Sequence, residues 1–195
     1  MNDNGNATTG KKYMLSAIRR KRLDRLPTTV LIGPYCARMS GYSVRDILTD
    51  AQKSAKAHLA FYDRFLPDSL IVYNDIYLEL EAIGCALEFP EDNISHPKRA
   101  MLENKKSLAG LKIPDPHKDA RLPYFLELCE SVSEKVRHEA SVGLGHSGPW
   151  NLAMHLRGAE QFLIDSIEDP EFVHELMAFT TEVVKTLGDT LIEQG

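Results

Sequence analysis

The sequence predicts an α/β protein with a parallel sheet. Three short runs rich in β-branched and apolar residues, at positions 28–32, 69–73 and 140–144, are each followed by a stretch with helical periodicity. Strands that alternate with helices in this way form right-handed βαβ units, which build either an α/β barrel or an open doubly wound sheet. No G-x-G-x-x-G motif follows the first run, so the pattern does not favour a dinucleotide-binding sheet.

Local signals mark the first strand and the helix after it. Residues 28–32 (TTVLI) form a nearly continuous apolar run closed by a Gly-Pro pair, which predicts a strand buried on both faces. Ser43 with Asp46 three positions later resembles a capping box, and apolar residues then recur at helical spacing as far as Phe65. We expect this helix to return the chain to the start of the second strand.

The second strand, residues 69–73, ends at an Asn-Asp pair, and an irregular region follows it. Between about 88 and 123 the chain is rich in proline and contains only short apolar pieces. A connection of this length inside a compact domain usually forms a functional flap or a small hairpin subdomain. His96 and His117 lie in this region without a second His or Cys at ligand spacing, so we interpret both as surface residues.

The stretch from 142 to 176 combines a strand, a polar turn and two helix starts. Its glycines allow the backbone of the turn to approach a ligand closely. Pro149 suits the first position of a helix because it lacks the N–H group that would be unpaired there, and Asp169 followed by Pro170 repeats this signal. The last helix, 170–194, carries one apolar stripe.

Composition restricts the classes of function. The 195-residue chain is 43% hydrophobic and 26% charged, which is ordinary for a soluble globular protein of one domain. A net charge of -5 disfavours general nucleic-acid binding and favours a small-molecule or protein partner. The sequence contains no apolar run long enough to cross a bilayer and no N-terminal signal core, so we expect a cytoplasmic protein without membrane contact. Residues 1–12 are polar and predict a disordered tail.

Three stretches carry a resemblance to a known superfamily: IVYNDIYLELEAIGCALEFPED, KIPDPHKDARLP and GHSGPWNLAMHLRGAEQFLIDSIEDPEFVHEL. In this order they are similar to the second strand with its turn, the link before the next helix, and the segment after the third strand in the uroporphyrinogen decarboxylase superfamily. That superfamily also contains the corrinoid (cobalamin) methyltransferases. The resemblance covers most of residues 22–195, and it implies a TIM (β/α)8 barrel with its active site at the C-terminal ends of the strands.

Chain length limits how much of such a barrel is present. An eight-fold barrel needs about 250 residues, whereas this sequence supplies about three βα units. We therefore interpret residues 13–195 as the N-terminal part of a uroporphyrinogen decarboxylase-like barrel domain, with an irregular insertion at about 88–123. Three parallel strands leave unpaired edges, which predicts that the chain self-associates through these edges and is catalytically inactive by itself.

The resemblance also implies site residues, since the barrel site follows the strand ends. The candidate catalytic residues are Asp75 and His155, and the candidate substrate-binding residues are Tyr35, Arg38, Asn74, His146 and Trp150. In the decarboxylase branch, an aspartate at the turn that matches Asp75 faces the pyrrole nitrogens of the substrate and stabilises a protonated ring. The alternative is that Asp75 caps the next helix. His155 either shuttles a proton near neutral pH or is a structural histidine on a partly buried helix.

Two departures from the decarboxylase pattern favour the methyltransferase branch. Decarboxylases carry two arginines close together after the first strand, whereas GPYCARMSGYS offers Arg38 alone. They also usually place a tyrosine where this chain has His155. Arg38 could bind a carboxylate or phosphate through a bidentate contact. For a complete form we therefore predict a corrinoid-dependent methyltransferase that moves a methyl group between a corrinoid protein and a thiol or other small acceptor.

Two alternatives to methyl transfer remain: porphyrinogen decarboxylation, a carboxy-lyase step of tetrapyrrole (heme) biosynthesis, and a non-catalytic interaction module. The methyltransferase branch holds zinc through a His-x-Cys pair and a later Cys, and zinc presents the acceptor thiol as a thiolate. This sequence contains no His-x-Cys, and its three cysteines lie far apart and are expected to be reduced. We expect no metal and no cofactor within this chain, and zinc and a corrinoid partner only for a complete methyltransferase.

Overall fold

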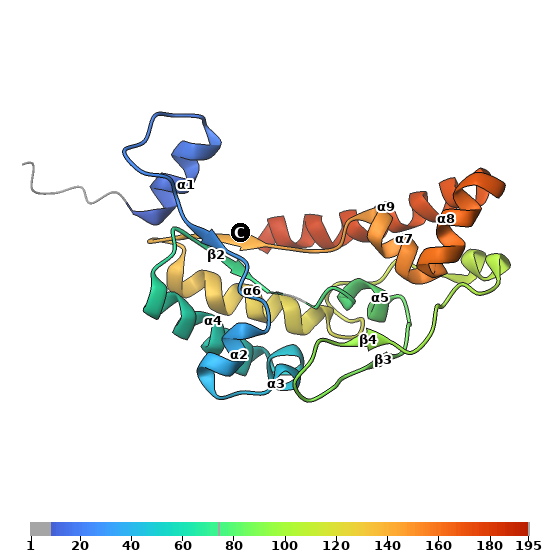
Figure 1. The fold of residues 1–195 in the computed structure, drawn as a ribbon, viewed down its shortest axis with the longest axis horizontal. Helices are drawn as coiled ribbons and strands as arrows, with labels where there is room; N and C mark the ends of the chain where they lie inside the picture. Colours follow the sequence, from blue (N-terminus) through green and yellow to red (C-terminus); the bar gives the residue numbers. More distant parts are fainter. Residues whose placement is uncertain (1–8, 74, 195) are drawn as a thin grey trace, which may run out of the picture. The chain divides into compact units, whose positions relative to one another are not determined.

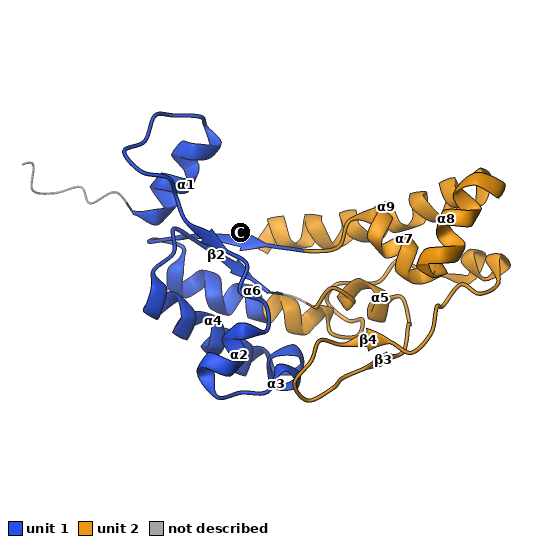
Figure 2. Cartoon of the chain, viewed as in Figure 1, with its two compact units in different colours: residues 1–73, 128–145 blue, residues 74–127, 146–195 orange. Residues whose placement is uncertain are grey.

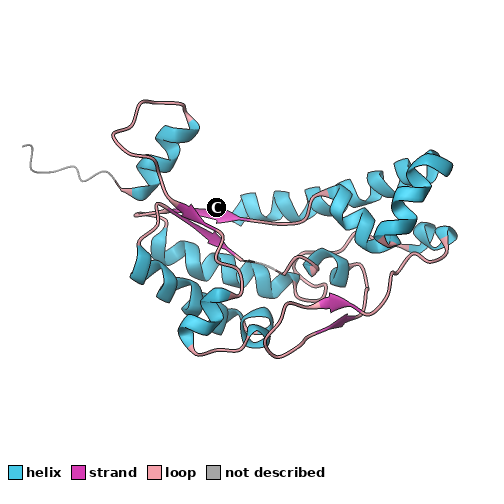
Figure 3. Cartoon of the chain, viewed as in Figure 1, coloured by secondary structure: helices cyan, strands magenta, loops and turns pink. Residues whose placement is uncertain are grey.

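The computed structural model describes residues 9–73 and 75–194, and it combines many helices with a parallel sheet (Figures 1 and 3). The helices are α1 (Gly10–Ile18), α2 (Tyr35–Ser40), α3 (Val44–Thr49), α4 (Ala51–Phe65), α5 (Leu78–Ala82), the 3-10 helix η1 (Lys105–Gly110), α6 (Leu122–Val136), α7 (Pro149–Arg157), α8 (Ala159–Glu168) and α9 (Pro170–Gln194). The strands are β1 (Thr29–Val30), β2 (Ser69–Val72), β3 (Leu87–Glu88), β4 (His96–Pro97) and β5 (Ser141–Leu144). The predicted α/β class with a parallel sheet is confirmed.

The chain divides into two compact units (Figure 2). Unit 1 contains residues 1–73 and 128–145, and unit 2 contains residues 74–127 and 146–195. Each unit therefore joins two separate segments of the chain. The one domain expected from residue 13 onward stays a prediction, and periodicity along the chain carries no information about which segments gather into one compact unit.

Unit 1 is built on a parallel sheet in the order β1-β2-β5. Leu70 of the central strand lies opposite Val30 of β1 and Val142 of β5. Leu70 and Val72 are fully buried, since β2 has a neighbouring strand on each side and helix α4 packs against it. All three strands fall inside the apolar runs that predicted them.

The first strand differs from its prediction. β1 spans only Thr29–Val30 with both residues exposed, and Leu31 after it is 74% exposed. The prediction of a strand buried on both faces was wrong, because β1 is an edge strand whose one partner in the described sheet is β2. An apolar run does not reveal the position of a strand within its sheet. Self-association through the sheet edges stays a prediction.

Several helix ends lie where local signals placed them. Ser43 and Asp46 form the capping box of α3, with each side chain accepting from the other residue's backbone N–H. Asp50 then caps α4 through its carboxylate, so the single helix expected here is two. Helix α7 begins at Pro149 as predicted, and Gly158, with φ 89°, separates it from α8. The sequence indicated one helix over that region, because a single internal glycine is tolerated in a helical pattern.

Unit 2 combines the short antiparallel hairpin β3-β4 with helices, and α9 packs against α7 and α8. The hairpin and η1 fall at or within the region that the sequence marked as irregular. The largest side chains of its apolar core include Leu80, Leu102, Leu152, Leu156, Phe162 and Leu176. These residues come from α5, the segment before η1, and the three C-terminal helices, so burial of their apolar surface holds the unit together.

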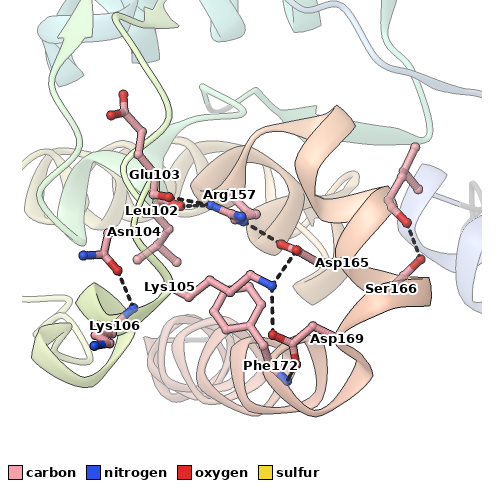
Figure 4. A network of polar contacts seen from close by, with 11 residues as sticks. Leu102, Glu103, Asn104, Lys105, Lys106, Arg157, Asp165, Ser166, Asp169 and Phe172 are labelled. Carbon is pink, nitrogen blue, oxygen red and sulfur yellow. Dashed lines mark hydrogen bonds and ion pairs between the residues drawn. The ribbon is translucent and has the colours of Figure 1, made fainter.

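A polar network supports this core (Figure 4). Buried Arg157 donates from Nε to Asp165 at 2.6 Å and from Nη1 to the carbonyl oxygen of Leu102 at 2.6 Å. Lys105 contacts Asp165 at 2.7 Å and Asp169 at 2.8 Å. Burial opposes ionisation of Asp165, but the hydrogen bonds from Arg157 and Lys105 outweigh it and lower its pKa. The network fixes the link between α7 and α8 onto the segment before η1.

Helix α1 changes the predicted boundary of the N-terminal tail. It begins at Gly10, and the side chain of Thr9 accepts a hydrogen bond from the backbone of Lys12. Residues 10–12, which the sequence assigned to a disordered tail, are therefore helical. Residues 1–8 lie outside the described part of the chain. A Cβ added at Gly10 would lie 2.6 Å from Cα of Asp68, so this helix start requires glycine.

A largely buried ion pair holds the segment before β1 to the start of β2. Asp68, 3% exposed, accepts from Arg25 at 2.6 and 2.7 Å and from the backbone N–H of Thr28 at 2.7 Å. The hydrogen bonds from Arg25 lower the pKa of Asp68 to about 2, although burial acts in the opposite direction. Asp68 thus stays ionised over the whole physiological range.

Replacing Asp68 with alanine is expected to lower the free energy of unfolding by about 2 kcal/mol at pH 7, because hydrogen bonds to a charged group are lost while half-exposed Arg25 remains hydrated. This stabilisation is fully present above the unfolded carboxyl pKa of about 3.9 and is lost as pH falls through the folded value. Urea unfolding followed by circular dichroism at pH 7 and pH 3 measures the difference, which should shrink at pH 3. Exposed Asp63→Ala is the control, and an equal loss in both variants would contradict the ion pair's role.

Candidate active site

The turn after β2 places Asp75 inside a polar cluster of unit 2. Asp75 is 1% exposed, and its Oδ1 accepts from the backbone N–H of Tyr77 at 3.2 Å. Its Oδ2 accepts from the hydroxyl of Ser95 at 2.5 Å and from Nη2 of Arg121 at 2.7 Å. The N-cap of α5 is Tyr77 and makes no side-chain cap hydrogen bond, so Asp75 shapes the turn before α5 but does not cap the helix. Its carboxylate is also held in a buried ion pair.

Arg121 binds two carboxylates in this cluster. Its Nη2 contacts Asp75 and its Nε donates to Glu81 at 2.6 Å, while its guanidinium lies 4.6 Å from the ring centroid of Phe89. The side chain of Arg121 is only 12% exposed, so these contacts are poorly screened by water. We call Asp75, Glu81, Ser95 and Arg121 the Arg121 cluster. Its two carboxylates and one guanidinium together carry one negative charge.

Glu79 and His146 form a second polar group in unit 2. Glu79 is 1% exposed, and its Oε1 accepts from the backbone N–H of Ser147 at 2.9 Å. Nδ1 of His146 lies 3.9 Å from the same oxygen. The hydroxyl of Ser147 donates to the carbonyl oxygen of Ile76 at 3.0 Å. The polar turn before α7 is therefore tied both to α5 and to the turn that precedes it.

Trp150 lies in the first turn of α7 and His155 in its last turn. The ring of His155 meets the ring of Tyr77 edge-on, with centroids 4.8 Å apart. Burial lowers the pKa of His155, so its imidazole is neutral at pH 7. Trp150 is 47% exposed and packs edge-on against Phe162. Half of its indole surface therefore remains available to a ligand.

The remaining predicted site residues belong to the other part of the chain. Tyr35 and Arg38 lie on α2 of unit 1, and both are exposed. Cys36 between them is buried, donates to the carbonyl oxygen of Gly33 and has its pKa raised to about 11 by burial. Asn74, also predicted for substrate binding, lies outside the described residues. Unit 2 alone thus holds Asp75, His146, Trp150 and His155, whose roles in substrate binding or catalysis stay predictions.

The sequence did not identify four polar residues of these groups: Glu79, Glu81, Ser95 and Arg121. Arg121 lies 46 positions from Asp75, and Ser147 lies 68 positions from Glu79. The available signal was a pair of glutamates, Glu79 and Glu81, within the short helix that follows Asp75. A buried glutamate needs a hydrogen-bond or ion-pair partner, but the sequence does not identify that partner because it comes from a distant segment.

The described residues do not fit a zinc ion. No group of three or more His, Cys, Asp and Glu side chains within residues 9–73 and 75–194 is arranged to hold a metal. The three cysteines, Cys36, Cys85 and Cys129, are each buried, and burial raises the pKa of Cys129 to about 12, which disfavours the thiolate that zinc binds.

We expect the purified chain to bind no stoichiometric zinc, since closed zinc sites need four ligands at tetrahedral geometry. Elemental analysis after dialysis without chelator is the measurement. Retention of one zinc per chain, lost in Cys36→Ser, would contradict the prediction and identify Cys36 as a ligand. Buried Cys129→Ser serves as the control for nonspecific effects of replacing a core thiol.

A groove of about 680 Å³ lies elsewhere in unit 2. Its lining includes Cys85, Lys98, Arg99, Met101 and Ser107. Neither the Arg121 cluster nor the two histidines near it contribute to this lining. The groove therefore provides no link to the polar groups described above.

Parallel strands whose carboxyl ends lead into polar turns are typical of α/β proteins that place their active sites beyond those ends. The family model for uroporphyrinogen decarboxylase (URO-D) matches residues 9–195. The chain therefore belongs to this family, which confirms the resemblance seen in the sequence. Among the described residues, the helices lack the combination of length and apolarity needed to span a membrane.

Curated relatives and a solved structure support the same placement. Uroporphyrinogen decarboxylases of Verminephrobacter eiseniae and Trichormus variabilis are 26% and 24% identical to the chain, over 93% and 96% of its length. The alignments cover 51% and 57% of those proteins, so the chain spans about half the length of the curated relatives it matches. A methyltransferase from Methanosarcina mazei, 21% identical, superposes with a TM-score of 0.85 over 97% of this chain and 57% of its own. This last likeness establishes a shared fold.

Proposed function

We propose that this chain supplies about three βα units of a URO-D-type (β/α)8 barrel, and that the complete protein transfers a methyl group between a corrinoid protein and a thiol or other small acceptor. The parallel order β1-β2-β5 is the strand order that consecutive units of a barrel require. The superposition on a methyltransferase over nearly the whole chain is consistent with this fold.

One observation carries the choice of methyl transfer over decarboxylation: the carboxylate of Asp75 is already engaged. A decarboxylase of this family would direct the matching aspartate at the pyrrole nitrogens of its substrate. Here both oxygens of Asp75 accept hydrogen bonds, and Arg121 neutralises the charge at 2.7 Å. Freeing this carboxylate for a substrate would break its buried hydrogen bonds with Ser95 and Arg121, which is costly.

The described residues can bind and orient an acceptor and move a proton. Exposed Arg38 offers a bidentate contact for a carboxylate or phosphate of a small acceptor. Within unit 2, half-exposed Trp150 separately offers an apolar surface to a ligand. Neutral His155 can hold the acceptor through a hydrogen bond, and a thiol acceptor must also lose its proton to a base as the carbon–sulfur bond forms.

Uroporphyrinogen decarboxylation remains the second candidate, because the curated relatives carry that name. In that case Asp75 would have to release Arg121 when the substrate binds. A non-catalytic interaction module is the third candidate, favoured for the chain alone by the exposed residues of β1.

The test uses the longest natural protein that contains this chain. It is incubated with methylcobalamin and a thiol, and in parallel with uroporphyrinogen III. We expect loss of the methylcobalamin absorbance with formation of a methyl thioether, a reduction in the Arg38→Ala variant, and no coproporphyrinogen. Coproporphyrinogen formation that disappears in Asp75→Asn would establish the decarboxylase instead. Absence of both products, with a folded protein, would favour the interaction module.

A further inference from the structure

Glu79 has a buried carboxyl group, and one of its two oxygens lacks a hydrogen-bond partner among the described residues. Oε1 accepts from the backbone N–H of Ser147, but Oε2 is buried from solvent and has no hydrogen-bond partner within residues 9–73 and 75–194. Buried polar atoms almost always have partners, and an unpaired carboxylate oxygen is among the most costly exceptions. Two explanations for such a group are that the carboxyl is protonated and that its negative charge serves a function.

The surroundings of Glu79 offer little to balance a negative charge. A narrow gap beside it is lined by the apolar side chains of Pro114, Pro116, Leu122, Val183 and Leu187. The nearby titratable groups are Asp75, which repels a second charge, and His146, which attracts it. Burial raises the pKa of Glu79, while the Ser147 N–H and His146 act in the opposite direction. The balance favours a proton on Glu79 at a higher pH than for an ordinary glutamate.

His146 connects this buried carboxyl to the exterior of unit 2. Its Nδ1 lies 3.9 Å from Oε1 of Glu79, and its side chain is 28% exposed where that of Glu79 is 1%. Nε2 is directed toward α9, where Gly188 carries no side chain to cover it. A small closure of the Nδ1 to Oε1 distance would give a direct hydrogen bond. The imidazole can therefore pass a proton between the buried carboxyl and a molecule beside the turn.

We propose that Glu79 and His146 act as a proton-accepting pair for the acceptor thiol, an inference that rests on the methyl transfer proposed above. The thiol S–H bond breaks and its proton binds Nε2 of His146, while the proton on Nδ1 moves to Oε1 of Glu79. The electron pair of the S–H bond stays on sulfur, which forms the new bond to the methyl carbon. The carbon–cobalt bond of the methylated corrinoid substrate breaks at the same time, and its electron pair stays on the cobalt. His146 is then the catalytic residue, and Glu79 is the positioning residue that stores the proton.

The pair makes a prediction for the chain by itself, without any assay of activity. Carbon-13 NMR of the labelled glutamate carboxyls should show Glu79 titrating above the ordinary glutamate range of about 4.3. His146→Gln should raise that midpoint further, by about one pH unit, because it removes the charge that favours the carboxylate. His96→Gln is the matched control, since His96 lies 4.0 Å from exposed Glu88 in the same unit. The control should leave the Glu79 titration in place.

Thermal stability gives a second readout of Glu79. Because its folded pKa is raised, its contribution to stability is present below the unfolded value of about 4.3 and is lost as pH rises through the folded value. The melting temperature of the wild type should therefore fall relative to that of Glu79→Gln between pH 4 and pH 8, by about 4 °C. A Glu79 that titrates in the ordinary range, or does not respond to His146→Gln, would overturn the proposal.

The pH profile of the complete enzyme separates this inference from the proposed function. If the pair accepts the thiol proton, kcat should rise with pH as Glu79 ionises, and Glu79→Gln should flatten that rise while Glu79→Asp keeps part of it. An unchanged profile in Glu79→Gln would exclude the relay even if methyl transfer is observed. If His146→Gln shifts the Glu79 titration in the NMR experiment but the complete enzyme transfers no methyl group, the coupling of Glu79 to His146 stands and the proposed reaction is wrong.

Discussion

Replacing Arg121 with alanine is expected to lower the free energy of unfolding by about 4 kcal/mol, because it removes one partner from a largely buried ion pair. Arg121 contacts Asp75 at 2.7 Å and Glu81 at 2.6 Å with only 12% of its side chain exposed. Without it, Asp75 and Glu81 lose the cation that they share in a poorly hydrated place, while Asp75 keeps its hydrogen bonds from Ser95 and the backbone N–H of Tyr77.

The experiment follows urea unfolding by the fluorescence of Trp150, the single tryptophan, which belongs to unit 2. Lys118→Ala is the matched control, because Lys118 pairs with Asp115 at 2.5 Å but is 78% exposed, and such surface pairs contribute about 0.5 kcal/mol. Arg121→Ala combined with Asp75→Asn should recover part of the loss, since the double variant no longer buries an unpaired Asp75 charge. A loss below about 1 kcal/mol for Arg121→Ala would show that water screens the cluster.

Arg157→Ala should have an effect nearly as large, about 3 kcal/mol, through loss of charged hydrogen bonds in the network of Figure 4. Arg157 is 7% exposed and donates to Asp165 and to the backbone carbonyls of Leu102 and Glu103. Its loss leaves those carbonyl oxygens buried with one donor fewer. Lys105 still contacts Asp165, so the carboxylate keeps one cation and the expected cost is smaller than for Arg121.

The same fluorescence experiment measures this variant, with Ser166→Ala as control on α8. The Ser166 hydroxyl donates to the carbonyl oxygen of Leu163 within its own helix, so its removal should change stability by less than about 0.5 kcal/mol. Arg157→Lys restores the charge but cannot reproduce the two directions in which the guanidinium donates, and it should recover less than half of the loss. Full recovery by lysine would mean that charge alone, without the backbone contacts, stabilises this link.

The two arginines affect function differently if the proposals hold. Arg121 fixes the turn that carries Asp75, whereas Arg157 supports a junction that shares no residue with either polar group of the candidate site. A milder variant, Arg121→Lys, should therefore reduce activity of the complete protein more than its effect on stability explains. Comparing the two lysine variants at equal stability separates activity lost through a displaced Asp75 turn from activity lost through lower stability.

Local sequence determined the α/β class, the positions of the three parallel strands and the starts of helices α3, α7 and α9. The capping box of Ser43 with Asp46 and the proline at 149 each act within one turn of helix, so spacing along the chain is sufficient to predict them. The stretches that resemble the URO-D family are also continuous in the sequence, so the family could be predicted from them without the structure. Candidate residues near strand ends followed from that assignment.

Only the tertiary structure decided which charges meet and which apolar residues stay exposed. Arg121 reaches Asp75 across 46 positions and Ser147 reaches Glu79 across 68, distances over which residue spacing carries no signal. The exposure of Leu31 depends on β1 being an edge strand, and sheet order is likewise a property of the folded chain. Burial and partner choice come from long-range packing, because desolvation and ion pairing depend on distance in space and not along the sequence.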